Sequence, residues 1–453
     1  MNSPIHRLTP VDMINLYAES PSAPARVGAI AVLDGHLLVG PVGGLHLDAI
    51  RRTLDRRLRR VPRLRQVIHR GGRFSGRPVW ADDPAFRIER HVRQLRLLRG
   101  DNLNDLAMRL VVQPFDPAHP PWRMWFITGM PDHRVGLVFA MHHVVADGVT
   151  TVRLFGALTD ATAEDTIGAM IARPQPPPSW RALVRDNLGA KFAAVRRWHR
   201  PDLAGWDSLR TIRNAPRTSL NLPVGPRRRI ETVTVDLAAA KQAAHDHGGR
   251  VNDLVLALAA GGLRALLAAR SERVDGIRLH VSVAQSLRGA DELDGPGNRS
   301  GGFAVRLPLD ADPHVRLRKI VRESAAARRI QPPTTGNSLL VGLSRLGLLR
   351  FFSRRQKMIN VVESNVAGPA AALRLMGAPI LEVVPVGTLV GNLTIGFLAL
   401  SYAGRLTVAV QVDADRYPDL PALLTAMHRE CATLMPSTPP RTEPIPAELT
   451  AQR

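Results

Sequence analysis

Two histidines followed by an aspartate and a glycine are the residues of this chain best suited to do chemistry. His142 and His143 come at the end of an apolar run, residues 135–141, and Asp147 and Gly148 follow closely. The run is short, continuous and bounded by polar or turn residues, which predicts a buried strand. Side chains alternate across a strand, so one imidazole can enter a cleft while the other packs behind it. Because imidazole titrates near neutral pH, the pattern favours a general base that takes a proton from a hydroxyl.

The same residues have plainer interpretations. Adjacent histidines are often ordinary surface or core residues, and the strand before them and the Asp-Gly after them are what favour catalysis. His142, His143 and Asp147 could also supply three metal ligands. Neighbouring strand histidines diverge, however, and no cluster of Cys or Glu lies nearby in the sequence. We therefore predict no metal.

Several neighbouring segments are predicted to position the motif. Residues 122–128 and 135–141 form an expected hairpin that turns at 130–132, and a helix that buries one face is expected after Gly148. Upstream, the pattern predicts a helix that begins at Pro10 with Thr9 as its cap, a strand over 27–33 and an arginine-rich amphipathic helix over 47–58.

Composition and charge limit the class of protein. The chain has 453 residues, 45% of them hydrophobic, which is enough for at least two domains. Lys and Arg total 61 against 39 Asp and Glu, a formal net charge of +22 that is carried mostly by arginine. The excess fits an anionic partner, such as a phosphorylated cofactor or an acidic membrane surface, or an arginine-rich coding bias. Aromatic residues make up 4% and do not alternate with basic ones, so we expect no nucleic acid partner.

The sequence also predicts where the protein resides. Cys431 is the one cysteine, so no intramolecular disulfide can form, which fits a reducing cytoplasm. The N-terminus lacks the apolar stretch of a signal peptide. The apolar segment 254–269 contains Gly261, Gly262 and Arg264, and we predict that it is too short and interrupted to span a bilayer. We expect a cytoplasmic protein that is soluble or peripheral at the inner membrane face or at lipid droplets.

Proline-rich punctuation divides the chain. We predict an N-terminal domain over 1–171, a basic linker over 172–226 and a C-terminal domain over 227–453. The middle of the linker fits either an amphipathic helix resting on lipid or a solvated helix. In the second half, strands are predicted over 230–235, 277–283, 303–307, 380–386, 393–401 and 406–412, and helices from 237, from 252, over 315–328 and over 339–352. Mixed strands and helices in both halves indicate an α/β or α+β fold.

Six further segments, taken with the histidine motif, resemble the bacterial wax ester synthase/diacylglycerol acyltransferase (WS/DGAT) family. The HHxxxDG pattern of His142 to Gly148 alone is shared with condensation domains and chloramphenicol acetyltransferase-like enzymes. The accompanying blocks, in family order, are Leu8-Thr9-Pro10-Val11-Asp12, Pro120-Pro121-Trp122-Arg123, Asn252-Asp253, Gly297-Asn298-Arg299, Ser364-Asn365-Val366-Ala367-Gly368-Pro369 and Ser401-Tyr402-Ala403-Gly404. The likeness covers about residues 7 to 435. Ala25-Arg26 stands where members usually have Met-His, Pro121 where they have Leu and Ala367 where they have Pro, which leaves substrate preference open.

The resemblance implies an α/β (α+β) fold of two chloramphenicol acetyltransferase-like domains, with mixed sheets flanked by helices and an active-site channel between them. It implies transfer of a fatty acyl group from acyl-CoA to diacylglycerol or a long-chain alcohol, without a cofactor. His143 would withdraw the proton as the hydroxyl attacks the thioester. His142 would assist or shape the pocket, and Asp147 would be mainly structural. The net positive charge would then serve the phosphates of CoA or an anionic lipid surface.

The tetrahedral intermediate of such a transfer needs a hydrogen-bond donor for its oxyanion. The candidates for that role or for substrate contact are Gly148, Asn252, Asp253, Asn298 and Asn365. Asn252 and Asp253 also fit a helix cap, and Asn298 and the residues 365–369 also fit ordinary turns. No Gly-x-Ser-x-Gly elbow is present and Cys431 lies far from the histidines, so we expect direct transfer without an acyl-enzyme.

Two other functions stay open from the sequence. One is a condensation-type acyltransferase that takes its acyl group from a carrier protein to make a specialised lipid or natural product. The other is a non-catalytic protein of lipid surfaces that binds through the basic linker.

Overall fold

Two six-stranded sheets form the framework of the computed structural model, which describes residues 5–40, 43–160, 174–196, 214–286, 300–329 and 348–435. The first sheet contains, in spatial order, β11 (Arg374–Leu375), β12 (Ala378–Val386), β1 (Arg26–Asp34), β6 (Arg134–His142), β5 (Trp122–Thr128) and β4 (Val92–Arg96). The second contains, in spatial order, β7 (Arg228–Asp236), β14 (Arg405–Asp413), β13 (Ile395–Tyr402), β10 (Val361–Ala367), β8 (Arg278–Ser286) and β9 (Ser300–Pro308). A separate hairpin pairs β2 (Gln66–His69) with β3 (Val79–Asp82).

Both large sheets are mixed, as the sequence predicted. In the first, β4 runs parallel to β5 while the other pairs are antiparallel. In the second, β10 runs parallel to both of its neighbours, β13 and β8. Parallel neighbours need crossover connections, and the one from β10 to β13 contains β11 and β12 of the first sheet.

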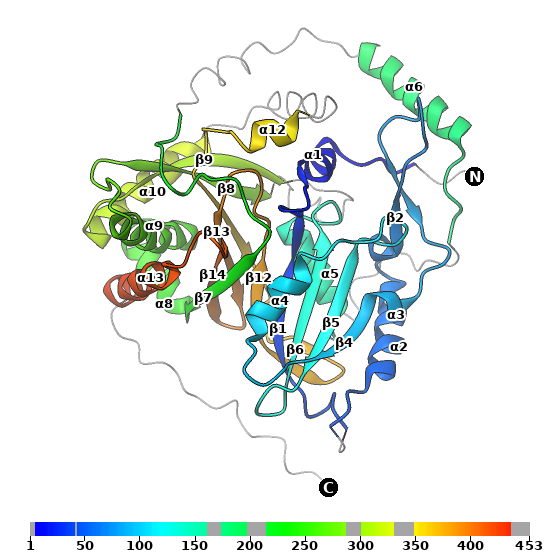
Figure 1. The fold of residues 1–453 in the computed structure, drawn as a ribbon, viewed down its shortest axis with the longest axis horizontal. Coiled ribbons are helices and arrows are strands. Elements are labelled where there is room, and N and C mark those ends of the chain that lie inside the picture. The colour runs from blue at the N-terminus through cyan, green and yellow to red at the C-terminus, as the bar shows by residue number, and fades with distance from the viewer. Residues whose placement is uncertain are drawn as a thin grey trace.

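Helices flank both sheets (Figure 1). Those of the first half are α1 (Pro10–Ala18), α2 (Leu47–Leu58), α3 (Ile88–His91), α4 (Leu103–Val111) and α5 (Gly148–Ala157), with a 3₁₀ turn at Pro62–Arg65. Those that follow are α6 (Trp180–Arg196), α8 (Leu237–Asp246), α9 (Val251–Ala269), α10 (Pro313–Arg329), α12 (Leu349–Ser353) and α13 (Leu420–Leu434). The helices α8, α9, α10 and α13 pack together beside the second sheet, at the left of Figure 1.

The first sheet is completed by strands from the C-terminal half of the chain. Strand β1 pairs antiparallel with β6 on one edge and with β12 on the other, so that Gly28 lies between Ala140 and Val386. The boundary predicted at residue 227 divides the sequence, but strands from both sides of it belong to the first sheet.

Most elements predicted from periodicity are present, and one prediction was wrong. Of the two alternatives left open for 365–369, the ordinary turn does not hold for Asn365, which lies inside strand β10, paired with Ala399 of β13. The apolar segment judged too short to span a bilayer belongs to α9, a helix of 19 residues that is long and apolar enough by composition. Its most apolar stretch is 72% buried, so α9 is a core helix in the group of helices that packs beside the second sheet. Of the helix predicted over 339–352, only the part from residue 348 lies within the described residues.

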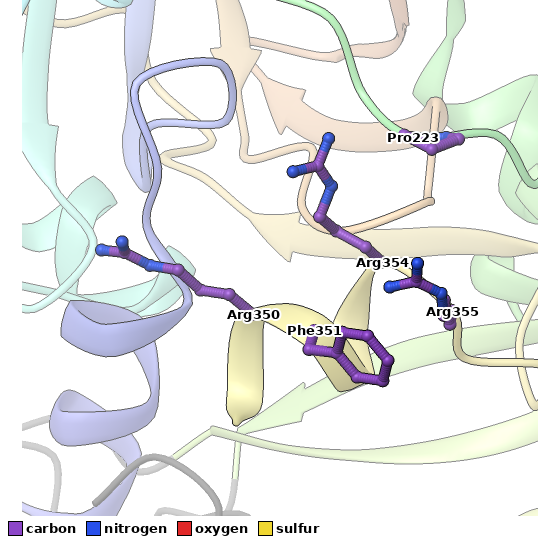
Figure 2. Close-up of a pocket in the computed structure, with 5 residues that line it drawn as sticks. All are labelled: Pro223, Arg350, Phe351, Arg354 and Arg355. Atoms are coloured by element: carbon purple, nitrogen blue, oxygen red, sulfur yellow. The ribbon is translucent and has the colours of Figure 1, made fainter. Parts of the chain in front are cut away.

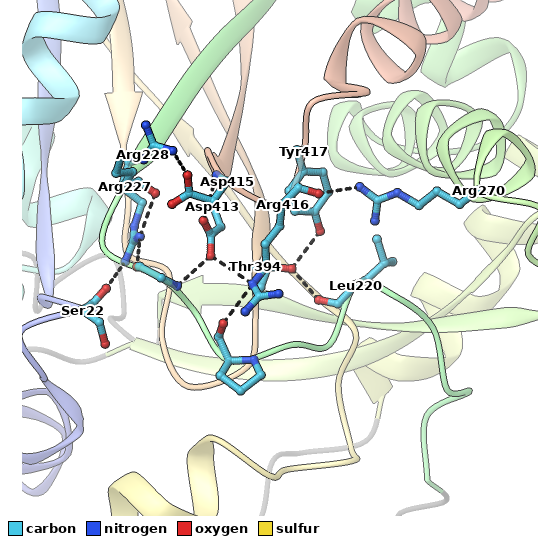
Figure 3. Close-up of polar contacts among 12 residues, drawn as sticks. Ser22, Leu220, Arg227, Arg228, Arg270, Thr394, Asp413, Asp415, Arg416 and Tyr417 are labelled. Atoms are coloured by element: carbon cyan, nitrogen blue, oxygen red, sulfur yellow. Dashed lines mark hydrogen bonds and ion pairs between the residues drawn. The ribbon is translucent and has the colours of Figure 1, made fainter.

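A buried ionic network joins the end of the linker, the second sheet and the first half of the chain (Figure 3). Arg228 at the start of β7 donates to the carbonyl oxygens of Ser22, at 2.8 Å, and Gly225, at 2.6 Å. The carboxylate of Asp413 accepts from the backbone N–H of Gly225 at 2.7 Å. Burial lowers the pKa of Arg228 to about 10, and the charge of Asp413 opposes that shift. Asp413 also pairs with Arg416 at 3.4 Å, so one buried carboxylate lies between two cations, of which Arg228 is the buried one.

We predict that Asp413→Ala lowers the free energy of unfolding by about 3 kcal/mol, because it leaves the Arg228 guanidinium buried without its counter-charge. Urea unfolding followed by circular dichroism measures the shift. The matched control is Asp415→Ala, since Asp415 pairs with Arg227 where both side chains are solvent-exposed. Such a surface pair contributes at most about 1 kcal/mol. Equal unfolding midpoints for the two variants would show that the buried network is not stabilising.

Candidate active site

A cavity of about 310 Å³ lies between the two sheets. Its walls come from β1 and β12 of the first sheet, from β8, β10 and β13 of the second, and from α1 and α5. Most of the lining is apolar. The lining residues with polar side chains are Asn15, His143, Asp147, Thr151, Ser282, Glu363, Ser364, Thr388 and Tyr402. A mostly apolar cavity with a few polar groups is the usual form of a small-molecule site.

His143 lies in the wall of this cavity, directly after the last residue of β6. Its backbone N–H donates to the carbonyl oxygen of Ala25 at 2.9 Å, which ties the histidine loop to the residue before β1. Burial lowers the pKa of His143, and the neighbouring His142 acts in the same direction, while Asp147 opposes the shift. The imidazole is therefore unprotonated at neutral pH and able to accept a proton.

His142 is buried, does not line the cavity and is held by hydrogen bonds at both ring nitrogens. Its Nδ1 accepts from the backbone N–H of Val144 at 3.0 Å, and its Nε2 lies 2.7 Å from the carboxylate of Glu19. A backbone N–H can only donate, so the proton of neutral His142 is on Nε2 and is donated to Glu19. Both nitrogens are engaged, and of the two imidazoles it is His143 that lines the cavity.

Asp147 and Gly148 shape the start of α5 at the cavity wall. The Asp147 carboxylate caps the helix by accepting from the N–H of Thr150 at 2.9 Å. A Cβ added to Gly148 would lie 3.0 Å from Val366 and 3.9 Å from the hydroxyl of Ser364. The glycine thus lets the histidine loop approach β10 of the second sheet.

The other predicted candidates that lie within the described residues do not line the cavity. Asn252 stands at the start of α9, where its side chain donates to Glu363 at 3.4 Å. Asp253 is fully buried, accepts from the N–H of Arg250 at 2.9 Å and pairs with Arg328, so it acts as a cap of α9. Asn365 lies on β10 without contributing to the lining. Asn298 lies outside the described residues.

Four polar residues near the histidines were missed in the sequence. Glu19 follows the last turn of α1 and contacts His142 from 123 positions away, and no local pattern could have revealed that pairing. Asn15 and Glu363 line the cavity from opposite halves of the chain. Ser364 stands inside a quoted motif, and strand alternation within that motif would have placed Ser364 and Asn365 on opposite faces.

The remaining reactive groups are elsewhere. Burial raises the pKa of the Cys431 thiol, on α13, to about 12, so this residue is a poor nucleophile at neutral pH. Within the described ranges, no group of three or more His, Cys, Asp or Glu side chains is arranged to hold a metal ion.

Comparison with known proteins identifies the family. Residues 8–255 match the model of the wax ester synthase/diacylglycerol acyltransferase catalytic domain, and residues 296–434 match the model of the WS/DGAT C-terminal domain. The chain belongs to the wax ester synthase/diacylglycerol acyltransferase family. It is therefore an acyltransferase.

Individual relatives agree with this assignment. A Mycobacterium tuberculosis protein named as a probable diacylglycerol O-acyltransferase, tgs1, is 27% identical over 429 residues, which cover 90% of this chain and 91% of that protein. A second M. tuberculosis relative, also named as a diacylglycerol O-acyltransferase, is 26% identical over 441 residues, covering 91% and 92% of the two chains.

Solved structures show the same fold. The wax ester synthase/diacylglycerol acyltransferase of Marinobacter aquaeolei superposes with a TM-score of 0.67 at 21% identity, over 95% of this chain and 98% of that one. The first condensation domain of the calcium-dependent antibiotic synthetase superposes with a TM-score of 0.62 at 16% identity, over 96% and 98%. The predicted mixed α/β fold, with two sheets flanked by helices, is thereby confirmed.

We predict that Glu19→Ala lowers kcat/KM about 10- to 100-fold, because it removes a charge-assisted hydrogen bond from His142 and loosens the loop that carries His143. Acyl transfer by the purified variant is the measurement. Asp34→Ala is the matched control, since Asp34 makes a carboxylate–imidazole contact of 2.6 Å with His36 at an exposed position. If both variants kept the parental rate, the Glu19–His142 contact would have no part in catalysis.

Proposed function

We propose that this enzyme transfers a fatty acyl group from acyl-CoA directly to the free hydroxyl of diacylglycerol or of a long-chain alcohol, with His143 as the general base. The observation that carries the proposal is the position of His143. It is an imidazole with a lowered pKa in the wall of a mostly apolar cavity between the two sheets.

The chemistry needs only the groups already described. The Nε2 or Nδ1 of His143 takes the proton of the acceptor hydroxyl as its oxygen bonds to the thioester carbonyl carbon. The tetrahedral intermediate then collapses, the carbon–sulfur bond breaks, and the CoA thiolate receives the proton from the imidazolium. Acyl-CoA acts as a co-substrate, and no further cofactor is required. Ser364, whose hydroxyl lies near Gly148 at the same wall, is the side chain that we propose as an oxyanion donor in place of Asn252 and Asn365.

The cavity and the charge of the chain support a neutral lipid acceptor and a phosphorylated donor. Residues such as Val152, Phe155 and Leu373 give the lining an apolar character that suits alkyl chains. The formal net charge of +22 suits the phosphates of CoA.

We predict that His143→Ala lowers the rate of thiol release from palmitoyl-CoA about 10²- to 10⁴-fold, because the general base is lost. The assay compares dioleoylglycerol and hexadecanol as acceptors, and the melting curve shows that the variant is folded. Because the pKa of His143 is lowered, the free base persists as the pH falls, and the acid limb of kcat/KM should lie below about 6.5.

Two results would contradict this proposal. One is a folded His143→Ala variant that retains the parental rate. The other is a parent protein that releases no thiol from acyl-CoA with either acceptor but transfers the acyl group of an acyl-carrier protein. That result would favour the condensation-type alternative.

We further propose that the enzyme works at an anionic lipid surface, on the cytoplasmic face of the membrane or on lipid droplets. An open pocket beside α12 is lined by Pro223, Phe351 and three arginines, Arg350, Arg354 and Arg355 (Figure 2). The Phe351 ring is 61% exposed, and Phe192 on the linker helix α6 is 69% exposed. Exposed aromatic rings beside arginines are typical of helices that rest at the surface of anionic lipid. This arrangement favours the lipid-bound interpretation of the linker region over a solvated helix.

We predict that Phe351→Ser weakens binding to phosphatidylglycerol-containing vesicles about 30-fold, since insertion of one aromatic ring is worth about 2 kcal/mol. Sedimentation with vesicles measures the partition. Leu37→Ser is the control, because Leu37 is equally exposed, at 61%, but lies far from α12 in the chain. An equal loss in both variants would show that α12 is not the docking surface.

A further inference from the structure

Glu363 on β10 is a buried carboxyl group that the proposed mechanism does not use. It belongs to the lining of the cavity and is only 2% exposed. Its Oε2 accepts a hydrogen bond from the side-chain amide of Asn252 at 3.4 Å. Its Oε1 has no hydrogen-bond partner among the residues that the structure describes. A buried polar atom without a partner is costly, and in a substrate cavity it indicates a group that the ligand is expected to satisfy.

The surroundings of Glu363 favour the uncharged acid. Burial raises its pKa to about 8, and the carboxylate of Asp253 adds to that shift, whereas the hydrogen bond from Asn252 opposes it. Asn252 and Asp253 face it from α9, and the nearby cation of α10, Arg328, pairs with Asp253 at 3.4 Å. No ion pair with Glu363 itself occurs in the described part of the chain. At pH 7 the side chain is therefore mostly a neutral carboxylic acid.

The hydrogen bond from Asn252 indicates which oxygen of the Glu363 acid carries the proton. An amide N–H can only donate, so Oε2 acts as the carbonyl oxygen of the acid and the O–H is on Oε1. Glu363 is thus a hydrogen-bond donor that has no acceptor among the described residues. A carboxylic acid kept neutral in an apolar site is known to act as a donor to substrate oxygen.

Strand β10 contributes several residues to the cavity wall, namely Val362, Glu363, Ser364 and Val366. Glu363 itself is paired on both sides, with Val283 of β8 and Phe397 of β13, so its backbone position is fixed by the sheet. Ser282 of β8 and Ser364 of β10 add two hydroxyl groups to the same lining.

We propose that Glu363, as a neutral acid, donates a hydrogen bond to an ester carbonyl oxygen of the acyl acceptor and so selects a glyceride over a simple alcohol. This rests on the function proposed above. Diacylglycerol carries two ester carbonyls besides its reacting hydroxyl, whereas a long-chain alcohol carries none. An ether-linked dialkylglycerol has the shape of diacylglycerol but lacks the carbonyl oxygens, so it isolates the proposed contact.

The test compares kcat/KM for dioleoylglycerol, its dialkyl ether analogue and hexadecanol, with palmitoyl-CoA as donor. The parent enzyme is expected to prefer the ester to the ether glyceride about 10-fold, the effect of one hydrogen bond of about 1.4 kcal/mol. Glu363→Met should abolish that preference while it leaves turnover of hexadecanol within a factor of about 2 or 3. Glu363→Gln should keep the preference, because its carbonyl accepts from Asn252 while its NH₂ group donates to the ester.

A pH series separates this role from a packing role. The ester preference of the parent should fall as the pH rises through about 8, because ionisation removes the donor. The preference of Glu363→Gln should stay constant over the same range. Both readouts use variants of matched size, and the glutamine variant decides the outcome even if the methionine variant fails to fold.

Several results would overturn the proposal. They are equal activity of the parent on the ester and ether glycerides, a uniform loss on all three acceptors in Glu363→Met, and loss of the ester preference in Glu363→Gln. Failure of the underlying function looks different, because the parent protein would then release no thiol with any of the three acceptors.

Discussion

The pairing of β1 with two strands at once is the constraint on which the rest of the structure depends. Strand β1 holds β6, which delivers the histidines, and β12, which returns from the far half of the chain. A Cβ added to Gly28 would lie 1.8 Å from the carbonyl oxygen of Phe139, so no other residue fits there without moving a strand. The same strand lines the cavity through Val27, Gly28 and Ala29. One close backbone contact therefore sets the distance between the histidine loop and the cavity wall.

The two histidines make different contacts because one ends strand β6 and the other follows it. His142 ends β6 and is engaged on both sides, by Val144 in its own loop and by Glu19 beyond α1. Glu19 also pairs with Arg26 of β1 at 2.6 Å. His143, one position later, is past the strand and faces the cavity. Arg26 thus helps to hold the glutamate that contacts His142.

The sequence predicted those parts of the fold that depend on local periodicity. The strand before His142, the helix capped by Asp147 and the core helix that begins near Asn252 are all present, because each is set by residues close together in the chain. The contacts of Glu19 with His142 and of β12 with β1 join residues more than a hundred positions apart, and no short pattern encodes them. The roles expected for Asn252 and Asn365 failed to match their positions for a related reason. Which face of a strand or helix meets a cavity depends on the partner that packs against it.

Desolvation links the electrostatics of the cavity to the kind of molecule it accepts. Burial lowers the pKa of His143 and raises that of Glu363, and both shifts favour the uncharged form near neutral pH. These two groups line the cavity from opposite halves of the chain and add no charge to it near neutral pH, although the whole chain carries a net charge of +22. The phosphates of the proposed acyl-CoA donor would gain from cations at the surface, where they stay hydrated. Only the neutral parts of the proposed substrates, the acyl chain and the acceptor lipid, would gain from entering the cavity, because a mostly apolar lining does not replace the hydration of a charge.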